Sequence, residues 1–164
     1  EGIVATTDPL RRLAAMIETD AAGAAAIAQR LRLSNVERAR LIALCDPPAR
    51  IDPEAPAASL RALLYRLGKN LWRDRVLLDW ADEIARGVPQ ERRRSDAWRA
   101  ICALPERDPP PAFPLRGSDA LALGVAAGLR LGTLLADVEE WWIAGNFAAD
   151  RAACLTQLAA LAGR

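Results

Sequence analysis

The sequence predicts an all-α fold, an array of about seven to nine helices arranged as a body and a small helical tail. Apolar residues make up 52% of the 164 residues, and most of them are alanine and leucine. These two residues favour helix, whereas the aromatic residues that sheets prefer reach only 5%. Apolar positions also recur at helical spacing along almost the whole chain, and no segment indicates a strand.

Capping residues mark three helix starts in the N-terminal third of the chain: Asp8, Asp20 and Ser34. Proline follows Asp8 at the first helical position, where its missing N–H costs nothing. Residues 21–31 form the second helix. Glu37 completes a capping box with Ser34, which begins the third helix, and Pro47-Pro48 ends it.

The middle of the chain predicts a loop followed by three more helices. The loop, residues 46–58, contains four prolines. The next helix ends at Gly68, and a longer helix covers residues 71–86. Capping side chains begin two of these helices: Ser59, and either Ser95 or Asp96.

Residues 105–114 carry five prolines and predict a semi-rigid spacer in an extended, polyproline conformation. We expect this spacer to separate a body, residues 1–104, from a tail, residues 115–164.

Four glycines divide the start of the tail into a short helix, a turn and a long helix: Gly117, Gly124, Gly128 and Gly132. Ser118 or Asp119 caps the short helix, and Gly124 ends it. Gly132 lacks a side chain one turn into the long helix, so we expect another backbone to approach there. The long helix extends to Ala144, and Asp150 caps the last helix.

The chain has no histidine, and its three cysteines are far apart in apolar segments: Cys45, Cys102 and Cys154. This pattern excludes histidine-based triads and most zinc sites, and it is not a disulfide framework. The cysteines therefore predict core residues of a protein in a reducing, cytoplasmic compartment. The most apolar early stretch, residues 21–28, is too short to cross a bilayer, so we expect no membrane partner.

The acidic residues form no catalytic pair. Glu139 and Glu140 are adjacent on a helix, so their side chains diverge by about 100° and do not share a site. We interpret Asp74 and Asp79 as solvated residues or as partners of an arginine one turn away. No catalytic residue, metal site or cofactor is therefore expected in this chain. It begins at Glu1 rather than at methionine, and we expect it to be part of a longer protein.

Basic residues give two candidate contacts for phosphate. The net charge is only +1, so any nucleic-acid surface must be local. Arg92, Arg93 and Arg94 form one basic patch, which either meets phosphates or is a solvated approach to the next helix. Arg116 and Arg130 flank the glycine-bearing turn of the tail, where free amides at a helix start attract phosphate. A plain helical hairpin, with glycines that serve packing, is the alternative for this segment.

The tail carries Gly-x-Asp, an apolar helix, Leu-Gly, a small-residue turn with glycine, Leu-Gly-x-Leu-Leu and an acidic helix ending in tryptophan. The matching residues are Gly117, Asp119, Leu123-Gly124, Gly128, Leu131-Gly132, Leu134-Leu135 and Trp141-Trp142. This pattern resembles the C-terminal region of bacterial tRNA nucleotidyltransferases, the CCA-adding enzymes and the related poly(A) polymerases. Further matches lie in the body: Leu33-Ser34-Asn35, Glu37-Arg38, the run from Leu63 to Gly68, Arg73-Asp74 and Leu77-Leu78.

The resemblance implies a helical body and tail that hold the acceptor stem and elbow of tRNA through shape and backbone contacts. It places the catalytic head, with Mg and the nucleotides CTP and ATP, outside this chain. The expected phosphate contacts, which position the RNA and do no chemistry, are Arg116, Arg130, Lys69 and the Arg92 to Arg94 group. The family often has Pro-Gly-Pro where this chain has Ala127-Gly128-Leu129, so we expect a less rigid turn here.

Two other functions stay open. The segment from Leu123 to Leu135 also fits a helix-hairpin-helix element, which would bind duplex DNA. Alternatively, Trp141 and Trp142 form a surface for a second copy of the chain, and the domain is a structural or homodimerising one.

Overall fold

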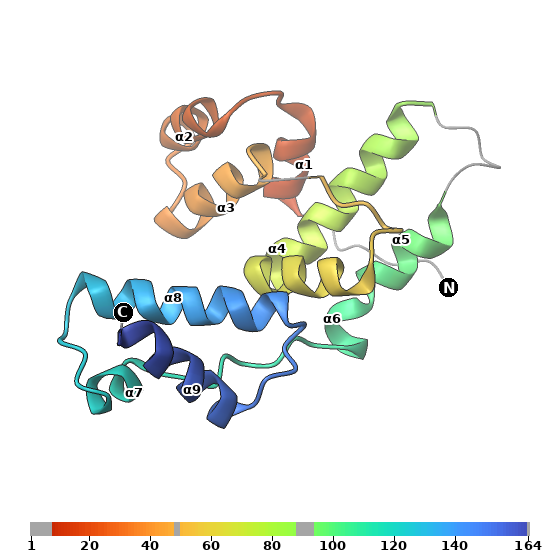
Figure 1. Cartoon of the computed structure of the whole chain (residues 1–164). Coiled ribbons are helices and arrows are strands. Elements are labelled where there is room, and N and C mark those ends of the chain that lie inside the picture. Colours follow the sequence, from red (N-terminus) through yellow and green to blue (C-terminus); the bar gives the residue numbers. More distant parts are fainter. Residues whose placement is uncertain (1–7, 48–49, 88–93, 164) are drawn as a thin grey trace. The chain divides into compact units, whose positions relative to one another are not determined.

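A computed structural model describes residues 8–47, 50–87 and 94–163 of the chain. These residues form nine α-helices and no strand, which confirms the all-α prediction (Figure 1). Their contacts divide the chain into two units, Glu1–Asp108 and Pro109–Arg164, and each unit is described by itself. Within the described ranges, no helix combines the length and the apolar character needed to cross a bilayer.

The first unit begins with three short helices: α1 (Pro9–Met16), α2 (Ala21–Arg30) and α3 (Asn35–Cys45). All three are capped as the sequence predicts. The carboxylates of Asp8 and Asp20 each accept the amide hydrogen of the residue three positions later, at 2.9 and 2.8 Å. Ser34 and Glu37 form the capping box. Three fully buried side chains lie in the core of this cluster: Ala24, Ala28 and Leu41.

The long helix α4 (Ala57–Ala85) begins two residues before Ser59, so the predicted cap is wrong. Pro56 occupies the cap position, and its carbonyl accepts the amide hydrogen of Leu60 at 3.1 Å. The two alanines that follow Pro56 are strong helix formers, so the helix includes them and begins before Ser59. Gly68 has a φ of 70°, which glycine adopts at little cost, so the predicted helix end is a break inside α4.

The last two helices of this unit, α5 (Ser95–Cys102) and α6 (Leu104–Arg107), both differ from the prediction. Neither Ser95 nor Asp96 caps α5. The Asp96 carboxylate instead binds Arg99, three residues later, at 2.8 Å. Helix α6 occupies the first part of residues 105–114, which were expected to be extended. Pro105 is tolerated there because the first turn of a helix needs no N–H from it.

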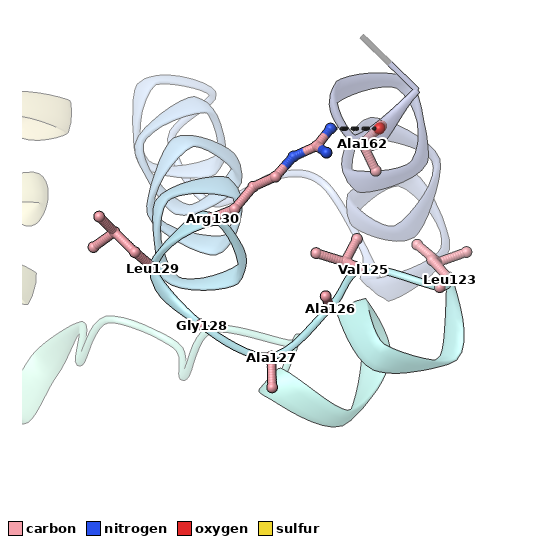
Figure 2. Close-up of a pocket in the computed structure, with 9 residues that line it drawn as sticks. Leu123, Val125, Ala126, Ala127, Gly128, Leu129, Arg130 and Ala162 are labelled. Atoms are coloured by element: carbon pink, nitrogen blue, oxygen red, sulfur yellow. Dashed lines mark hydrogen bonds between the residues drawn. The ribbon is translucent and has the colours of Figure 1, made fainter.

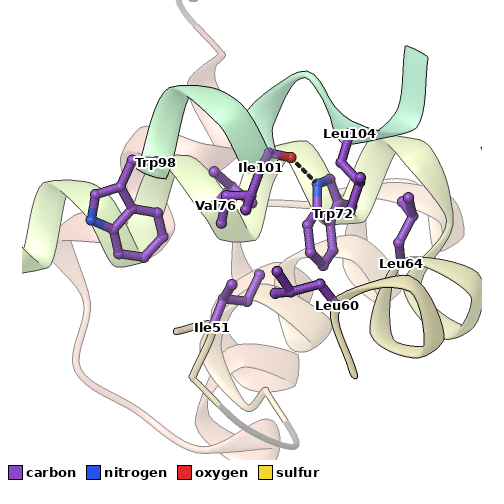
Figure 3. Close-up of a cluster of buried hydrophobic side chains, with 8 residues drawn as sticks. All are labelled: Ile51, Leu60, Leu64, Trp72, Val76, Trp98, Ile101 and Leu104. Carbon is purple, nitrogen blue, oxygen red and sulfur yellow. Dashed lines mark hydrogen bonds between the residues drawn. The ribbon is translucent and has the colours of Figure 1, made fainter. Parts of the chain in front are cut away.

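Two buried indole rings belong to the larger core in this unit (Figure 3). Trp72 of α4 and Trp98 of α5 are 0% and 1% exposed. The aliphatic side chains of this core are Ile51, Leu60, Leu64, Val76, Ile101 and Leu104. Burying one tryptophan removes about 150–250 Å² from water, which corresponds to roughly 4–6 kcal/mol. Trp72 Nε1–H also donates to the Ile101 carbonyl at 2.9 Å, so its burial leaves no unpaired donor.

Two buried carboxylates on α4 tie this unit together. Asp74 is 3% exposed and binds Arg11 of α1 at 3.0 Å and Arg40 of α3 at 2.7 Å. Asp79 is 7% exposed and pairs with Arg75, one turn earlier, at 2.7 Å. The predicted arginine partner one turn away is thus found for Asp79, but the prediction is wrong for Asp74. Its partners lie 63 and 34 residues away in sequence, so helical spacing does not reveal them.

The second unit consists of α7 (Gly117–Ala122), α8 (Leu129–Ala144) and α9 (Arg151–Ala162), and α8 contacts the other two. Asp150 caps α9 as predicted, accepting the Ala153 amide hydrogen at 2.8 Å. Neither Ser118 nor Asp119 is the cap of α7, because the helix already begins at Gly117. Asp119 instead accepts the amide hydrogen of Arg116 at 2.7 Å.

The core of the second unit is centred on Trp142 of α8, which is 2% exposed. Its ring lies 5.5 Å from the Phe113 ring and 4.9 Å from the Phe147 ring, and its Nε1–H donates to the Ala149 carbonyl at 2.9 Å. Trp142 is therefore packed in the core of its own unit. Only Trp141, at 40% exposure, is accessible to a partner, so the two tryptophans do not form the shared surface that a homodimer was expected to use.

Candidate nucleic-acid interface

Two glycines determine the turn between α7 and α8. Gly124 has a φ of 82° and Gly128 a φ of 140°, conformations that residues with a side chain rarely adopt. Gly124 ends α7 at the position that the sequence indicates. The following amide, of Val125, donates to the Ala120 carbonyl at 3.1 Å and closes the helix end. Gly128 then directly precedes α8.

This turn borders a pocket of about 370 Å³ (Figure 2). The lining consists of residues 123–130 and Ala162, the last residue of α9. Among these described lining residues, Arg130 carries the one charged side chain, so no carboxylate opposes it in the pocket. No side chain caps α8 at Gly128. The amides of its first turn therefore keep their capacity to donate, at the positive end of the helix dipole.

Two exposed arginines lie at this turn. Arg130 Nη2–H donates to the Ala162 carbonyl at 3.0 Å, which directs the side chain across the pocket (Figure 2). This bond uses one of several N–H donors of the guanidinium. Arg116 directly precedes α7. A methyl group at Gly117 would lie 3.8 Å from Leu131 Cδ2, so the start of α7 lies against the first turn of α8. The two arginines therefore extend from neighbouring parts of the unit.

Asp119 holds the start of α7 against the start of α9. Its two carboxylate oxygens accept from Arg151 Nη2 at 2.6 Å and Nη1 at 3.1 Å. These hydrogen bonds, with the one from the Arg116 amide, hold the pKa of Asp119 below its ordinary value. Arg151 also donates to the Pro114 carbonyl at 2.6 Å. Sequence reasoning found Asp119 but missed Arg151, because 32 residues separate the two and no local pattern connects them.

Gly132 does not have its predicted role. A methyl group added at this position would meet no described atom within 4 Å, so no backbone approaches it and the prediction is wrong. Gly132 is exposed on α8. Nothing in the structure explains why this position is glycine.

The basic patch before α5 is only partly within the described residues, since Arg92 and Arg93 lie outside them. Arg94 is bound by carboxylates on two sides: Glu83 at 2.7 Å and Asp52 at 2.6 Å. The hydrogen bond to Glu83 is the main reason why the pKa of Arg94 is raised. Arg94 therefore connects three segments of its own unit, and a phosphate would have to displace these carboxylates.

Lys69 forms an exposed ion pair with Glu106 at 2.9 Å. For Arg116 and Arg130, by contrast, the described part of the chain contains no carboxylate within ion-pair distance. Of the predicted phosphate contacts that the structure describes, these two are the most accessible to an anion. In the same ranges, no group of three cysteine, aspartate or glutamate side chains is arranged to hold a metal ion.

The uncharacterized 28 kDa protein in the petA 5′ region of Rhodospirillum rubrum is 43% identical to this chain over 74 residues. These residues are 45% of this chain and 29% of that protein, so the match spans less than a third of the relative's length. The name of this relative states no activity. No family model and no solved structure matches the chain.

Proposed function

We propose that this chain is the C-terminal tRNA-binding region of a CCA-adding tRNA nucleotidyltransferase or a related poly(A) polymerase. In this proposal it positions the tRNA, and a catalytic head outside this chain adds nucleotides to the 3′ end. The observation that carries the proposal is the exposed pair Arg116 and Arg130 beside the uncapped start of α8. Guanidinium groups and free helix-start amides are the donors that bind phosphate oxygens.

A protein surface that contacts only the sugar-phosphate backbone is suited to binding an RNA helix. Side chains do not enter the deep, narrow major groove of A-form RNA, so proteins bind it through phosphates, riboses and shape. Three exposed leucines border the same turn and supply an apolar surface for ribose faces: Leu121, Leu123 and Leu129. The resemblance of the tail motif to that of the tRNA nucleotidyltransferases supports the same class of partner. The chain itself supplies position and no chemistry, and binding of Mg, CTP and ATP belongs to the proposed head.

Fluorescence anisotropy with labelled tRNA, at about 50 and 200 mM salt, tests this proposal because phosphate contacts weaken steeply over that range. Arg130→Gln and Arg116→Gln should each weaken binding and lower the slope of log K against log salt by about one. Arg86→Gln is the matched control. It removes the same charge from an exposed residue whose partner, Asp82, keeps a second ion pair with Arg50.

The outcomes separate the candidate functions. Absence of tRNA binding by the unsubstituted chain at about 50 mM salt would refute the proposal. Tighter binding to duplex DNA than to tRNA would favour the helix-hairpin-helix function. Concentration-dependent sedimentation without any nucleic-acid binding would favour the structural, dimerising one.

A further inference from the structure

Among the described residues, three helices end in the same pair of backbone hydrogen bonds, with a left-handed residue just after the helix. The left-handed residues are Arg32 after α2 (φ 54°), Gly124 after α7 (φ 82°) and Asn146 after α8 (φ 51°). After α2, the Arg32 amide donates to the Gln29 carbonyl at 3.1 Å and the Leu33 amide to the Ala28 carbonyl at 3.0 Å. Glycine and asparagine are the residues usually found at this position, and arginine is not.

The geometry of the turn does not explain the arginine. A glycine at position 32 would make the same backbone hydrogen bonds without the contact between Cβ and the carbonyl that disfavours left-handed residues. Strained backbone of this kind concentrates at sites that serve function. The side chain of Arg32 is therefore the feature that needs a reason.

Two further arginines are close to Arg32 in the sequence: Arg30, the last residue of α2, and Arg38, in the first turns of α3. All three are exposed. No ion pair involves any of them in the part of the chain that the structure describes. Helices α2 and α3 pack side by side (Figure 1). The three arginines lie at the end of α2, in the connection between the helices and in the first turns of α3, so they share one end of this helix pair. We name Arg30, Arg32 and Arg38 the α2–α3 corner.

The surroundings of the corner leave it with an excess of positive charge, because three arginines face a single carboxylate. Glu37 is the one acidic residue in the sequence 21–45. Its carboxylate accepts from the amide and the hydroxyl of Ser34 at 2.8 and 2.7 Å, and these bonds hold its pKa below the ordinary value. Arg40, by contrast, binds Asp8 and Asp74 at 2.8 and 2.7 Å. Exposed apolar side chains accompany the arginines: Leu31 at 54% and Val36 at 79% exposure.

We propose that the α2–α3 corner is a second RNA-binding surface, which contacts the phosphate backbone of RNA. This inference rests on the proposed function and adds to it a contact surface, in the first unit, that the sequence did not indicate. The planar guanidinium groups fit phosphate oxygens bidentately, and the exposed Leu31 and Val36 pack against riboses. Because the contacts are to phosphates, the corner adds affinity and salt dependence and reads no base sequence.

The test is the salt dependence of tRNA binding by Arg32→Gly, Arg32→Lys and the control Arg86→Gln. Glycine removes the charge and relieves the backbone, whereas lysine keeps the charge at the same position. We expect Arg32→Gly to lower the slope of log K against log salt by about 0.9 and to weaken binding roughly three- to tenfold near 100 mM salt. Arg32→Lys should retain most of the slope, and Arg86→Gln should retain all of it.

Arg38→Gln provides an independent variant at a regular helical position and should also lower the slope by about 0.9. If Arg32→Gly and Arg38→Gln bind tRNA like the unsubstituted chain while Arg130→Gln binds more weakly, the corner is not a contact and the tail function stands. If the unsubstituted chain does not bind tRNA, both proposals fail. Polyglutamate is the test for an acidic partner other than RNA. If Arg32→Gly and Arg38→Gln lose more affinity for polyglutamate than for tRNA, the choice of RNA as the partner is wrong.

Discussion

Replacing Asp74 by asparagine tests whether buried ion pairs hold the first unit together. The Asp74 side chain is 4% exposed, and its arginine partners are 14% (Arg11) and 32% (Arg40) exposed. Removing one member of a buried pair costs about 3–5 kcal/mol, because the remaining charge stays out of water. Arg40 keeps Asp8 at 2.8 Å and partial access to solvent. We therefore expect the lower end of that range, about 3 kcal/mol of unfolding free energy.

Urea unfolding followed by far-UV circular dichroism measures this loss. With a denaturant slope of about 1–3 kcal/mol/M, a loss of about 3 kcal/mol lowers the midpoint by roughly 1–3 M. Asp82→Asn is the control, because Asp82 also binds two arginines but its side chain is 38% exposed. Exposed pairs contribute about 0–1 kcal/mol, so its midpoint should move by less than half as much.

Equal midpoint shifts for Asp74→Asn and Asp82→Asn would refute the reasoning. They would mean that water reaches Asp74 in solution and that its two arginines are screened like surface charges. Unequal shifts of the expected order would show that α1 and α3 are held to α4 by this carboxylate. The orientation of the α2–α3 corner would then depend on it, since Arg40 lies on α3.

Three further predictions concern single residues. Arg32→Gly should raise the free energy of unfolding, measured by urea titration, by about 0.5–1 kcal/mol. The gain is the relieved strain of the left-handed backbone, minus the cost of the greater entropy that glycine has in the unfolded chain. Gly132→Ala should raise it by a similar amount, about 0.5–1 kcal/mol, because the added methyl meets nothing within 4 Å, and a loss of stability would show an unseen contact. The pKa of Asp119 is lowered in the folded chain, so its contribution to stability is complete above the ordinary value of 3.8 and is lost as pH falls through the folded value. The unsubstituted chain should therefore have a higher free energy of unfolding than Asp119→Asn at neutral pH, and this difference should shrink as the pH falls below about 4. A difference that stays constant from about pH 6 to 3 would contradict this.

Local features of this fold could be predicted from the sequence, and long-range ones could not. The caps at Asp8, Asp20 and Ser34 follow from contacts three residues apart, which a sequence displays directly. Gly124 is found in the same way. The partners of Asp74 depend on how α1, α3 and α4 pack, which no spacing rule contains.

The candidate site shows the same division. The sequence identified Arg116 and Arg130 by their place beside the glycine turn. It could not distinguish them from Arg94, because the carboxylates that bind Arg94 come from two other segments of the chain. It also missed Arg32, because a helix that ends on arginine gives no local signal of its left-handed backbone.

Arg32 is the position where stability and binding should change in opposite directions. If the arginine merely happened to follow α2, glycine would stabilise the chain and leave tRNA binding unchanged. Asn146 provides the internal comparison, since it takes the same left-handed conformation after α8 with a residue that tolerates it and carries no charge. A strained residue that also carries an unpaired charge is difficult to explain by folding alone, because glycine satisfies the fold better. A variant that is more stable and binds more weakly would show that the charge, and not the turn, accounts for this arginine.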